Sequence, residues 1–298
     1  MGVILKPTKR AKERILVYGG GGTGKTFDAL TVAHRTLGAG QMLWVLDTDN
    51  SVTTLLEEID TFAGLGIAFD GHNVWPDPSV RWEHDDTFPA EEGGKVCIYH
   101  ATTWDEACAG LAEIVDQAGP QDWILVDSVS QLWTWVQEWF VKKTHGEDMA
   151  EWLVDWRIEQ LKDGKAGNQE AQALLADGAW TFINAQWKKH VTELALNPPC
   201  HLFMTAEAKA LRSDGKDQKA VKVMYDGIGA KPEGQWALGH KMKTVLFKDK
   251  TRGANPTRRT TTVKDWGRED RMLDEDEVAD FAMGYLKNVA GWRLEKEG

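Results

Sequence analysis

The chain has 298 residues, 42% of them hydrophobic, which is enough for the core of one large α/β domain. Its formal net charge of −11 argues against a protein that coats nucleic acid with its whole surface. No apolar run reaches the roughly eighteen residues of a membrane span, and residues 1–14 lack the pattern of a secretory signal. We therefore predict a cytoplasmic protein with no membrane partner.

The charge is unevenly distributed along the chain. Residues 1–14 form a basic arm with a net charge of +4, residues 15–204 sum to −18, residues 205–264 to +8 and residues 265–298 to −5. A local basic stretch is what a groove for nucleic acid needs. A solvated basic face without a partner explains the same charges equally well.

A glycine-rich motif follows the first predicted strand. Residues 15–18 form a short apolar run, and residues 25–37 have the apolar spacing of a helix. Between them the sequence fits the phosphate-binding pattern G-x-x-x-x-G-K-[ST] at every fixed position, with residues Gly19, Gly20, Gly21, Gly22, Thr23, Gly24, Lys25 and Thr26. The motif predicts a nucleotide-binding loop for ATP.

The chemistry of such a loop explains its residue types. Glycines let backbone N–H groups turn inward around phosphate oxygens at a helix N-terminus, where the helix dipole favours an anion. Lys25 is expected to reach the β- and γ-phosphates, and the Thr26 hydroxyl is the expected ligand of Mg²⁺.

Two further predicted strands end in carboxylates. Residues 41–46 are followed by Asp47 and Asp49, and residues 123–126 are followed by Asp127. The carboxyl ends of strands are where open α/β sheets bind ligands, and Asp127 stands where a phosphate-loop enzyme holds Mg²⁺ through a water molecule. Other predicted elements are a helix at 51–62, an acidic insertion at 64–94, a strand at 96–99 and a helix at 104–117.

Residues 130–197 form a predicted helical insertion that contains seven tryptophans. Aromatic rings can stack on the bases of single-stranded DNA. Five apolar residues fall at helical spacing, however, and we expect them to face the core: Trp180, Ile183, Trp187, Val191 and Leu194.

The last third of the chain begins with a strand at 201–205, and Glu207 lies just past its end, where a polar side chain can sense a γ-phosphate. Residues 208–234 are predicted to be a long mobile loop. Residues 241–248 and 258–264 alternate like two antiparallel strands. A final helix is expected at 275–288, with Asp274 as its cap.

Basic residues cluster in and near the predicted mobile loop. If DNA is bound, the candidate contacts are Lys209, Arg212, Lys216, Lys219 and Lys222. Trp236, close to the end of this loop, is a candidate for base stacking, although a packing role explains it as well.

The order of these motifs resembles the RecA-like P-loop ATPase superfamily. Within it, the chain is most similar to RecA-like single-strand-annealing recombinases and related ATP-binding proteins of phages. The stretch Ile124-Leu125-Val126-Asp127-Ser128, continued by residues 129–132, looks like that superfamily's second motif. The stretch at 234–238 is similar to the segment that closes its second DNA-binding loop. The resemblance implies a doubly wound, mostly parallel sheet with an antiparallel extension, formed as a single domain over residues 1–298.

The resemblance also implies roles for individual residues. Asp49 occupies the place of the glutamate that activates the attacking water, and is one methylene shorter. Glu207 lies near the glutamine that senses the γ-phosphate. Lys264 matches a basic residue that reaches the nucleotide of a neighbouring subunit, and Arg268 could substitute for a second basic residue that Trp266 replaces. Lys25, Asp49, Glu207 and Lys264 are therefore the expected catalytic group.

We expect a Mg²⁺-dependent ATPase that forms a homo-oligomeric ring or filament and acts on single-stranded DNA in recombination, annealing or repair. One alternative is a nucleotide-gated assembly or regulatory ATPase that never binds DNA, which the acidic body would allow. Another is a motor for helicase or packaging work.

Overall fold

A computed structural model of the chain describes residues 12–37, 41–58, 81–83, 95–146, 148–162, 178–212, 219–250, 258–265 and 274–276. Several predictions lie outside the described residues. They concern most of the arm at 1–14, most of the insertion at 64–94, residues Lys216, Trp266 and Arg268, and residues 277–288 of the expected last helix.

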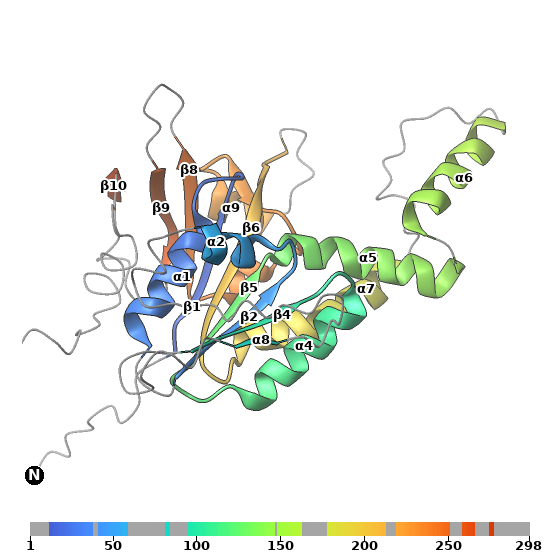
Figure 1. Cartoon of the computed structure of the whole chain (residues 1–298). Helices are drawn as coiled ribbons and strands as arrows, with labels where there is room; N and C mark the ends of the chain where they lie inside the picture. Colours follow the sequence, from blue (N-terminus) through green and yellow to red (C-terminus); the bar gives the residue numbers. More distant parts are fainter. Residues whose placement is uncertain are drawn as a thin grey trace, which may run out of the picture.

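A mostly parallel sheet forms the centre of the molecule (Figure 1). Six parallel strands lie side by side in the order β8-β1-β6-β5-β2-β4. They are β1 (Arg14–Gly19), β2 (Met42–Asp47), β4 (Lys95–His100), β5 (Trp123–Asp127), β6 (His201–Ala210) and β8 (Thr244–Lys250).

Antiparallel strands extend this sheet. On one side β8 pairs with β9 (Arg258–Asp265), which pairs with β10 (Asp274–Asp276). On the other side β4 pairs with β3 (Arg81–Glu83). Off this order, the end of the central strand β6 pairs with β7 (Ala230–Pro232). The predicted antiparallel pair after residue 241 is thus confirmed as β8 and β9.

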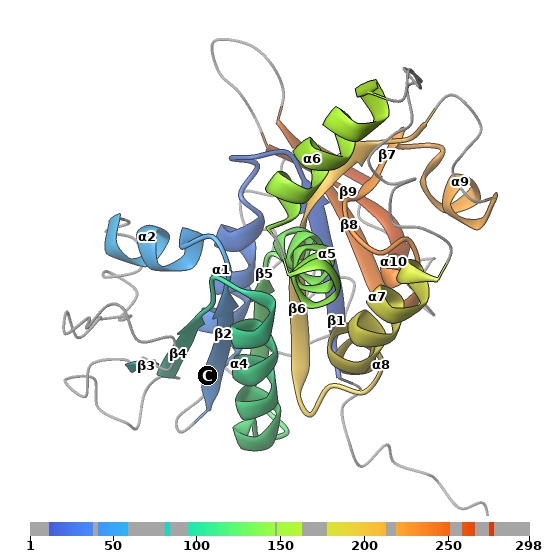
Figure 2. The same cartoon turned by 90° about the vertical axis from the view of Figure 1, so that its right-hand side faces the viewer.

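Helices cover both faces of the sheet (Figures 1 and 2). One face packs against α1 (Lys25–Thr36) and α2 (Ser51–Glu58). The other packs against α4 (Trp104–Gln117), α5 (Val129–His145) and α7 (Ala179–Trp187), which a π-helical turn at Lys188–Thr192 continues into α8 (Glu193–Leu196). The remaining helices are α6 (Met149–Lys162), α9 (Lys219–Tyr225) and α10 (Leu238–Lys241).

The strand sequences explain why both faces are covered. In β1 the side chains of Ile15 and Val17 enter the core on the α1 side, and those of Leu16 and Tyr18 enter the core on the α5 side. Successive side chains of a strand point to opposite faces, so a continuous apolar run needs a layer on each. The predicted α/β architecture is confirmed in its strand directions, its antiparallel extension and its helices on both faces of the sheet.

The structure agrees with the predicted packing of the helical insertion. Ile183, Trp187, Val191 and Leu194 are buried, and Trp180 packs against the same core. No helix among the described residues combines the length and apolar character needed to cross a membrane.

The prediction of one long loop at 208–234 is wrong in the described part of that segment. Strand β6 continues to Ala210 and pairs with β7, and α9 forms between them. Val221 and Tyr225, four residues apart on one face of α9, are both buried, and the Tyr18 hydroxyl donates to the Ala230 carbonyl at 2.9 Å. The lysines of α9 obscured this short apolar pattern in the sequence.

The prediction that Asp274 caps a helix beginning at residue 275 is also wrong. Residues 274–276 form β10, in which Glu275 lies opposite Thr260 and Asp276 opposite Arg259. The edge of β9 offers unpaired backbone groups to a neighbouring segment, and residues 274–276 pair with it.

Candidate functional site

The glycine-rich loop lies between the end of β1 and the start of α1, as predicted. Two positions explain the glycines. A Cβ on Gly19 would lie 2.2 Å from the Lys248 carbonyl oxygen, and Gly24 has a φ of 87°, a left-handed conformation that side chains disfavour. Gly24 caps α1 without a side-chain hydrogen bond. The first turn of α1 therefore presents backbone amides that no cap occupies, which is an anion-binding arrangement.

Lys25 is largely buried beside this loop, with 8% of its side chain exposed. Its ammonium donates to the carbonyls of Gly19 at 3.1 Å and Gly20 at 3.0 Å. It also forms an ion pair with the Glu207 carboxylate at 3.1 Å. A carboxylate therefore occupies the place at which such a lysine meets phosphate.

Glu207 is held in place through its backbone. It lies opposite Gly19 where β6 pairs with β1, its N–H donates to the Ser130 hydroxyl oxygen at 2.9 Å, and its carbonyl accepts from Glu233 N–H at 2.7 Å. The Ser130 hydroxyl in turn donates to the Glu233 carbonyl at 2.8 Å. These bonds connect β6, the start of α5 and the segment after β7, so that the Glu207 side chain faces the loop from a fixed backbone.

Asp127, at the end of β5, is 2% exposed and accepts three hydroxyl hydrogen bonds. Thr26 donates to its Oδ2 at 2.7 Å and Ser51 to the same atom at 2.8 Å, and Thr205 donates to Oδ1. Burial and the charge of Asp49 raise the pKa of Asp127, and the three hydroxyl donors oppose that shift. The structure thus brings together Thr26 and Asp127, the two predicted metal-binding residues. The peptide bond from Asp127 to Ser128 is cis.

Asp47 is the last residue of β2 and Asp49 follows that strand, next to this group. Asp47 is fully buried and lies opposite Asp127 in the β2–β5 register. Burial, followed by the charges of Asp127 and Asp49, raises the pKa of Asp47 to about 7. The Asp49 side chain accepts from Ser51 N–H at 3.0 Å in a turn where Asn50 has a φ of 62°. Asp49 is exposed, so its carboxylate is open to solvent at the carboxyl edge of the sheet.

Three side chains at this site had no predicted role there. Ser51 marks the start of the helix predicted at 51–62, and the sequence patterns assign no function to Thr205 or Arg258. Ser51 and Thr205 both donate to Asp127, and the Arg258 guanidinium lies over Gly24 and Phe27. Thr205 is a polar residue at the carboxyl end of the strand predicted at 201–205, which places it near this edge of the sheet but does not identify its partner; no sequence signal connects Ser51 or Arg258 to the site.

A buried ion pair adjoins the loop on the β8 side. Lys248 is 3% exposed, and its ammonium donates to the Asp28 carboxylate on the first turn of α1. Burial lowers the pKa of Lys248, and the charge and hydrogen bond of Asp28 oppose that shift. The pair attaches α1 to β8 at the level of the loop.

Lys264 lies at the other end of the strands. It pairs with Val245, whose partner in β1 is Leu16, whereas the loop follows Gly19, whose partner is Lys248. The Lys264 ammonium donates to the carbonyls of Gly239 at 3.3 Å, His240 at 3.0 Å and Met242 at 2.6 Å. Within one chain Lys264 therefore holds the C-terminal end of α10. Its role toward a neighbouring subunit stays a prediction.

The candidate DNA contacts lie on and around α9. Lys219 is exposed and Lys222 half-buried on α9, and Arg212 follows β6. Lys209 forms an exposed ion pair with Glu233 at 3.0 Å. Trp236 is 44% exposed, and its ring centroid lies 6.3 Å from that of His240. Trp236 is thus open to a stacking partner on at least part of its surface.

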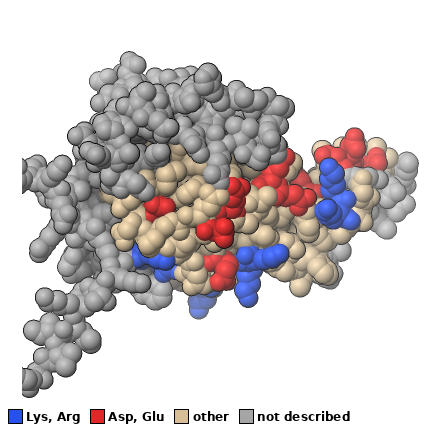
Figure 3. Space-filling view, turned by 60° about the horizontal axis from the view of Figure 1, so that its bottom comes forward, with Lys and Arg blue, Asp and Glu red and all other residues tan. Residues whose placement is uncertain are grey.

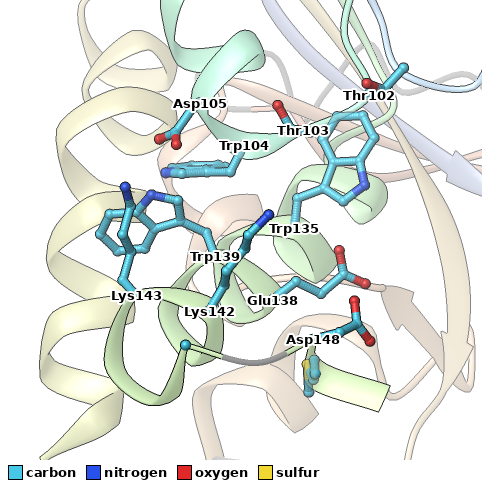
Figure 4. Close-up of a pocket in the computed structure, with 12 residues that line it drawn as sticks. Thr102, Thr103, Trp104, Asp105, Trp135, Glu138, Trp139, Lys142, Lys143 and Asp148 are labelled. Atoms are coloured by element: carbon cyan, nitrogen blue, oxygen red, sulfur yellow. The ribbon is translucent and has the colours of Figure 1, made fainter. Parts of the chain in front are cut away.

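A separate cavity of about 620 Å³ lies between α4, α5 and the start of α6 (Figure 4). Three indoles and charges of both signs line it, including Trp104, Trp135, Trp139, Glu138, Lys142, Lys143 and Asp148. Burial and the charge of Asp148 raise the pKa of Glu138. The volume suits a small ligand, but the mixed charges favour no chemical class, and no residue of the glycine-rich loop lines the cavity.

No protein-family model matches the sequence, and no curated protein does either. Among solved structures, one of an ATPase from the type III secretion system of pathogenic bacteria is similar, with 12% sequence identity and a TM-score of 0.34. The match covers 80% of this chain and 51% of that one, so the chain spans about half the length of the matched protein. A likeness of this size carries no argument about function, which has to come from the site itself.

Proposed function

We propose that the chain is a RecA-like, Mg²⁺-dependent P-loop ATPase. The observation that carries this proposal is the joint placement of Lys25 at the glycine-rich loop and of Thr26 against Asp127. The strand before the loop, β1, and the strand that ends in Asp127, β5, are neighbours of the same strand, β6, which supplies Glu207 and Thr205. Residues from three adjacent strands therefore meet at one edge of the sheet.

These residues fit the chemistry of a bound nucleotide. When bound, Mg²⁺·ATP supplies the phosphoanhydride bond that water cleaves. The uncapped amides of α1 and the Lys25 ammonium would hold the phosphates once Glu207 releases the ammonium. The Thr26 hydroxyl and the Asp127 carboxylate are oxygen donors, which Mg²⁺ prefers.

Asp49 and Glu207 are the proposed groups for water activation and phosphate sensing. Asp49 is the exposed carboxylate nearest in sequence to the end of β2, and its charge acts on both Asp47 and Asp127. Asp47 is fully buried whereas Asp49 is exposed, so the Asp49 carboxylate is the one of the two that a water molecule from solvent can reach.

The experiment that tests this function measures Mg²⁺·ATP binding and phosphate release for the parent chain, Lys25→Ala and Asp49→Asn. We expect Lys25→Ala to lose binding, since Lys25 compensates phosphate charge, and Asp49→Asn to bind but hydrolyse slowly. Lys189→Ala, on the π-helical turn, is a matched control that removes an exposed lysine far from the loop in sequence. Normal binding by a folded Lys25→Ala protein would overturn the proposal.

We further propose that this ATPase acts on single-stranded DNA in recombination or annealing. The exposed Trp236 ring and the lysines of α9 favour this function over a regulatory ATPase. On the face shown in Figure 3, by contrast, acidic and basic side chains of the described residues are interspersed. ATP hydrolysis measured with and without single-stranded DNA over a salt series distinguishes the two: stimulation supports DNA action, and its absence favours the regulatory ATPase.

Assembly into a homo-oligomer is part of the same proposal. If Lys264 or Arg268 reaches a neighbour's nucleotide, specific activity rises with protein concentration. Mixing Lys264→Ala chains with Lys25→Ala chains then restores some complete sites. A chain that is monomeric with ATP and fully active when dilute would contradict assembly.

A further inference from the structure

Arg258, the first residue of β9, reaches the glycine-rich loop from the antiparallel part of the sheet. Its guanidinium lies against Gly24, because a Cβ placed on that glycine would be 3.0 Å from Nη1 and 3.2 Å from Cζ. The same Cζ is 5.9 Å from the centroid of the Phe27 ring. The guanidinium thus covers the junction between the loop and the first turn of α1.

The two sides of the loop carry different groups. Strands β6 and β5 lie on one side of β1, and strands β8 and β9 lie on the other. Glu207, which pairs with Lys25, comes from β6, and Asp127, which accepts from Thr26, comes from β5. Arg258 comes from the opposite side.

Two basic residues on the β8 side, Lys248 and Arg258, have different surroundings. Lys248 is paired with Asp28 and is almost fully buried. Arg258 is exposed, and within the described part of the chain no carboxylate forms an ion pair with it. An arginine of this kind, beside a helix start without a side-chain cap, is placed to meet an anion.

We infer that Arg258 binds the α-phosphate of the nucleotide, an inference that rests on the proposed function. In a loop of this type the backbone amides hold the α- and β-phosphates, and the lysine reaches the β- and γ-phosphates. Because Lys25, Glu207 and Asp127 mark the γ-phosphate side, the α-phosphate lies toward Gly24 and Phe27, under Arg258. The planar fork of a guanidinium suits two phosphate oxygens.

Nucleoside diphosphates and triphosphates both carry an α-phosphate, so Arg258 strengthens the binding of both equally. A packing role for Arg258 over Phe27 would change the stability of the fold and leave nucleotide affinity alone. Affinity for the two kinds of nucleotide therefore distinguishes the roles.

The test is calorimetric titration of the full chain with Mg²⁺·ADP and with Mg²⁺·ATPγS. We expect Arg258→Ala to bind both about tenfold more weakly or worse, as for the loss of a charge-assisted hydrogen bond. Arg258→Lys keeps the charge without the fork and should recover part of the affinity. Arg259→Ala is the matched control, because the next residue of a strand points to the opposite face.

Each outcome decides between the claims. If the parent chain binds neither nucleotide, the proposed function fails and this inference fails with it. If the parent binds and a folded Arg258→Ala variant binds equally well, only the inference on Arg258 fails. A loss confined to ATPγS would place Arg258 at the γ-phosphate and overturn the α-phosphate assignment. Unfolding curves show whether Arg258→Ala is folded. If it is not, the titrations are repeated with Arg258→Gln, which keeps more of the packing over Phe27.

Discussion

The ion pair between Lys25 and Glu207 sets the first prediction at the scale of single residues. A bound phosphate must displace the Glu207 carboxylate from the Lys25 ammonium. The negative charge of that carboxylate also repels the phosphate. Glu207 is 46% exposed, so the pair is worth at most about 1 kcal/mol. We expect Glu207→Gln to bind Mg²⁺·ADP up to about fivefold more tightly, and the gain to shrink as salt is added.

The matched control for this prediction is Glu233→Gln. Glu233 has a similar exposure of 42% but pairs with Lys209, away from the Lys25 ammonium. Calorimetric titration of the two variants at low and high salt gives the comparison. Equal or weaker ADP binding by Glu207→Gln would show that its carboxylate does not compete with phosphate.

Asp47 gives a prediction about pH. Its pKa is raised to about 7 in the folded chain by burial and by Asp127 and Asp49, from an ordinary value of 3.8. Between about pH 4 and 7 the folded state therefore keeps a proton that the unfolded state has lost, and the free energy of unfolding falls as pH rises. Asp47→Asn cannot titrate. We expect the free energy of unfolding of Asp47→Asn, relative to that of the parent, to increase from about pH 4 to pH 7. Urea unfolding without Mg²⁺ measures it. Parallel pH profiles of the two chains would show that the pKa of Asp47 is not raised.

The sequence predicted the site residues that one continuous motif contains. The loop from Gly19 to Thr26 lies together because it is contiguous, and Asp127 was predictable because an apolar strand ends there. Ser51, Thr205 and Arg258 join the site only through strand order and register, which a single sequence does not specify. Glu207 is intermediate: the sequence places it just past the predicted strand at 201–205, whereas β6 continues through it to Ala210, and its ion pair with Lys25 follows only from the structure.

At the scale of secondary-structure elements, the buried pair of Lys248 and Asp28 should hold α1 on β8. Lys248→Met removes the ion-pair partner of a buried carboxylate, and we expect a loss of about 3 kcal/mol or more in the free energy of unfolding. The double variant with Asp28→Leu should recover most of that loss, because no buried charge remains. Urea unfolding measures all three chains.

Lys250→Met is the control for that pair, since Lys250 is an exposed lysine on the same strand. Its effect should stay within about 0.5 kcal/mol. If Lys248→Met is as stable as the parent, the pair does not fasten α1 to the sheet.

Element boundaries were predictable where apolar periodicity was strong. Helix α4 begins and ends as predicted, with Ala107, Leu111 and Ile114 buried on one face. The prediction failed for α9, which is only seven residues long, and for β10, whose three residues are all charged, because the deciding contacts come from elsewhere in the chain. For α9 these contacts are the core around Tyr225, and for β10 they are the backbone groups of β9.

At the scale of the whole molecule, the acidic body and the basic segment at 205–264 predict where DNA would bind. With Lys209 paired to Glu233 and Lys216 outside the described residues, the two lysines of α9 are the clearest phosphate contacts. Single-stranded DNA affinity should fall with salt at a log–log slope of roughly −0.7 per phosphate contacted. We expect Lys219→Ala with Lys222→Ala to flatten that slope by about 1.4, because two counterion-releasing contacts are lost.

The control for DNA binding is Lys142→Ala with Lys143→Ala, which removes two exposed lysines from the last turn of α5 and should leave the slope unchanged. Trp236→Ala should weaken binding by ~1–3 kcal/mol without changing the slope, because stacking releases no counterions. Fluorescence anisotropy of a labelled oligonucleotide over a salt series measures both quantities. If the α9 and α5 variants lose equal slope, the contact is general attraction to lysine, and the DNA site lies away from α9.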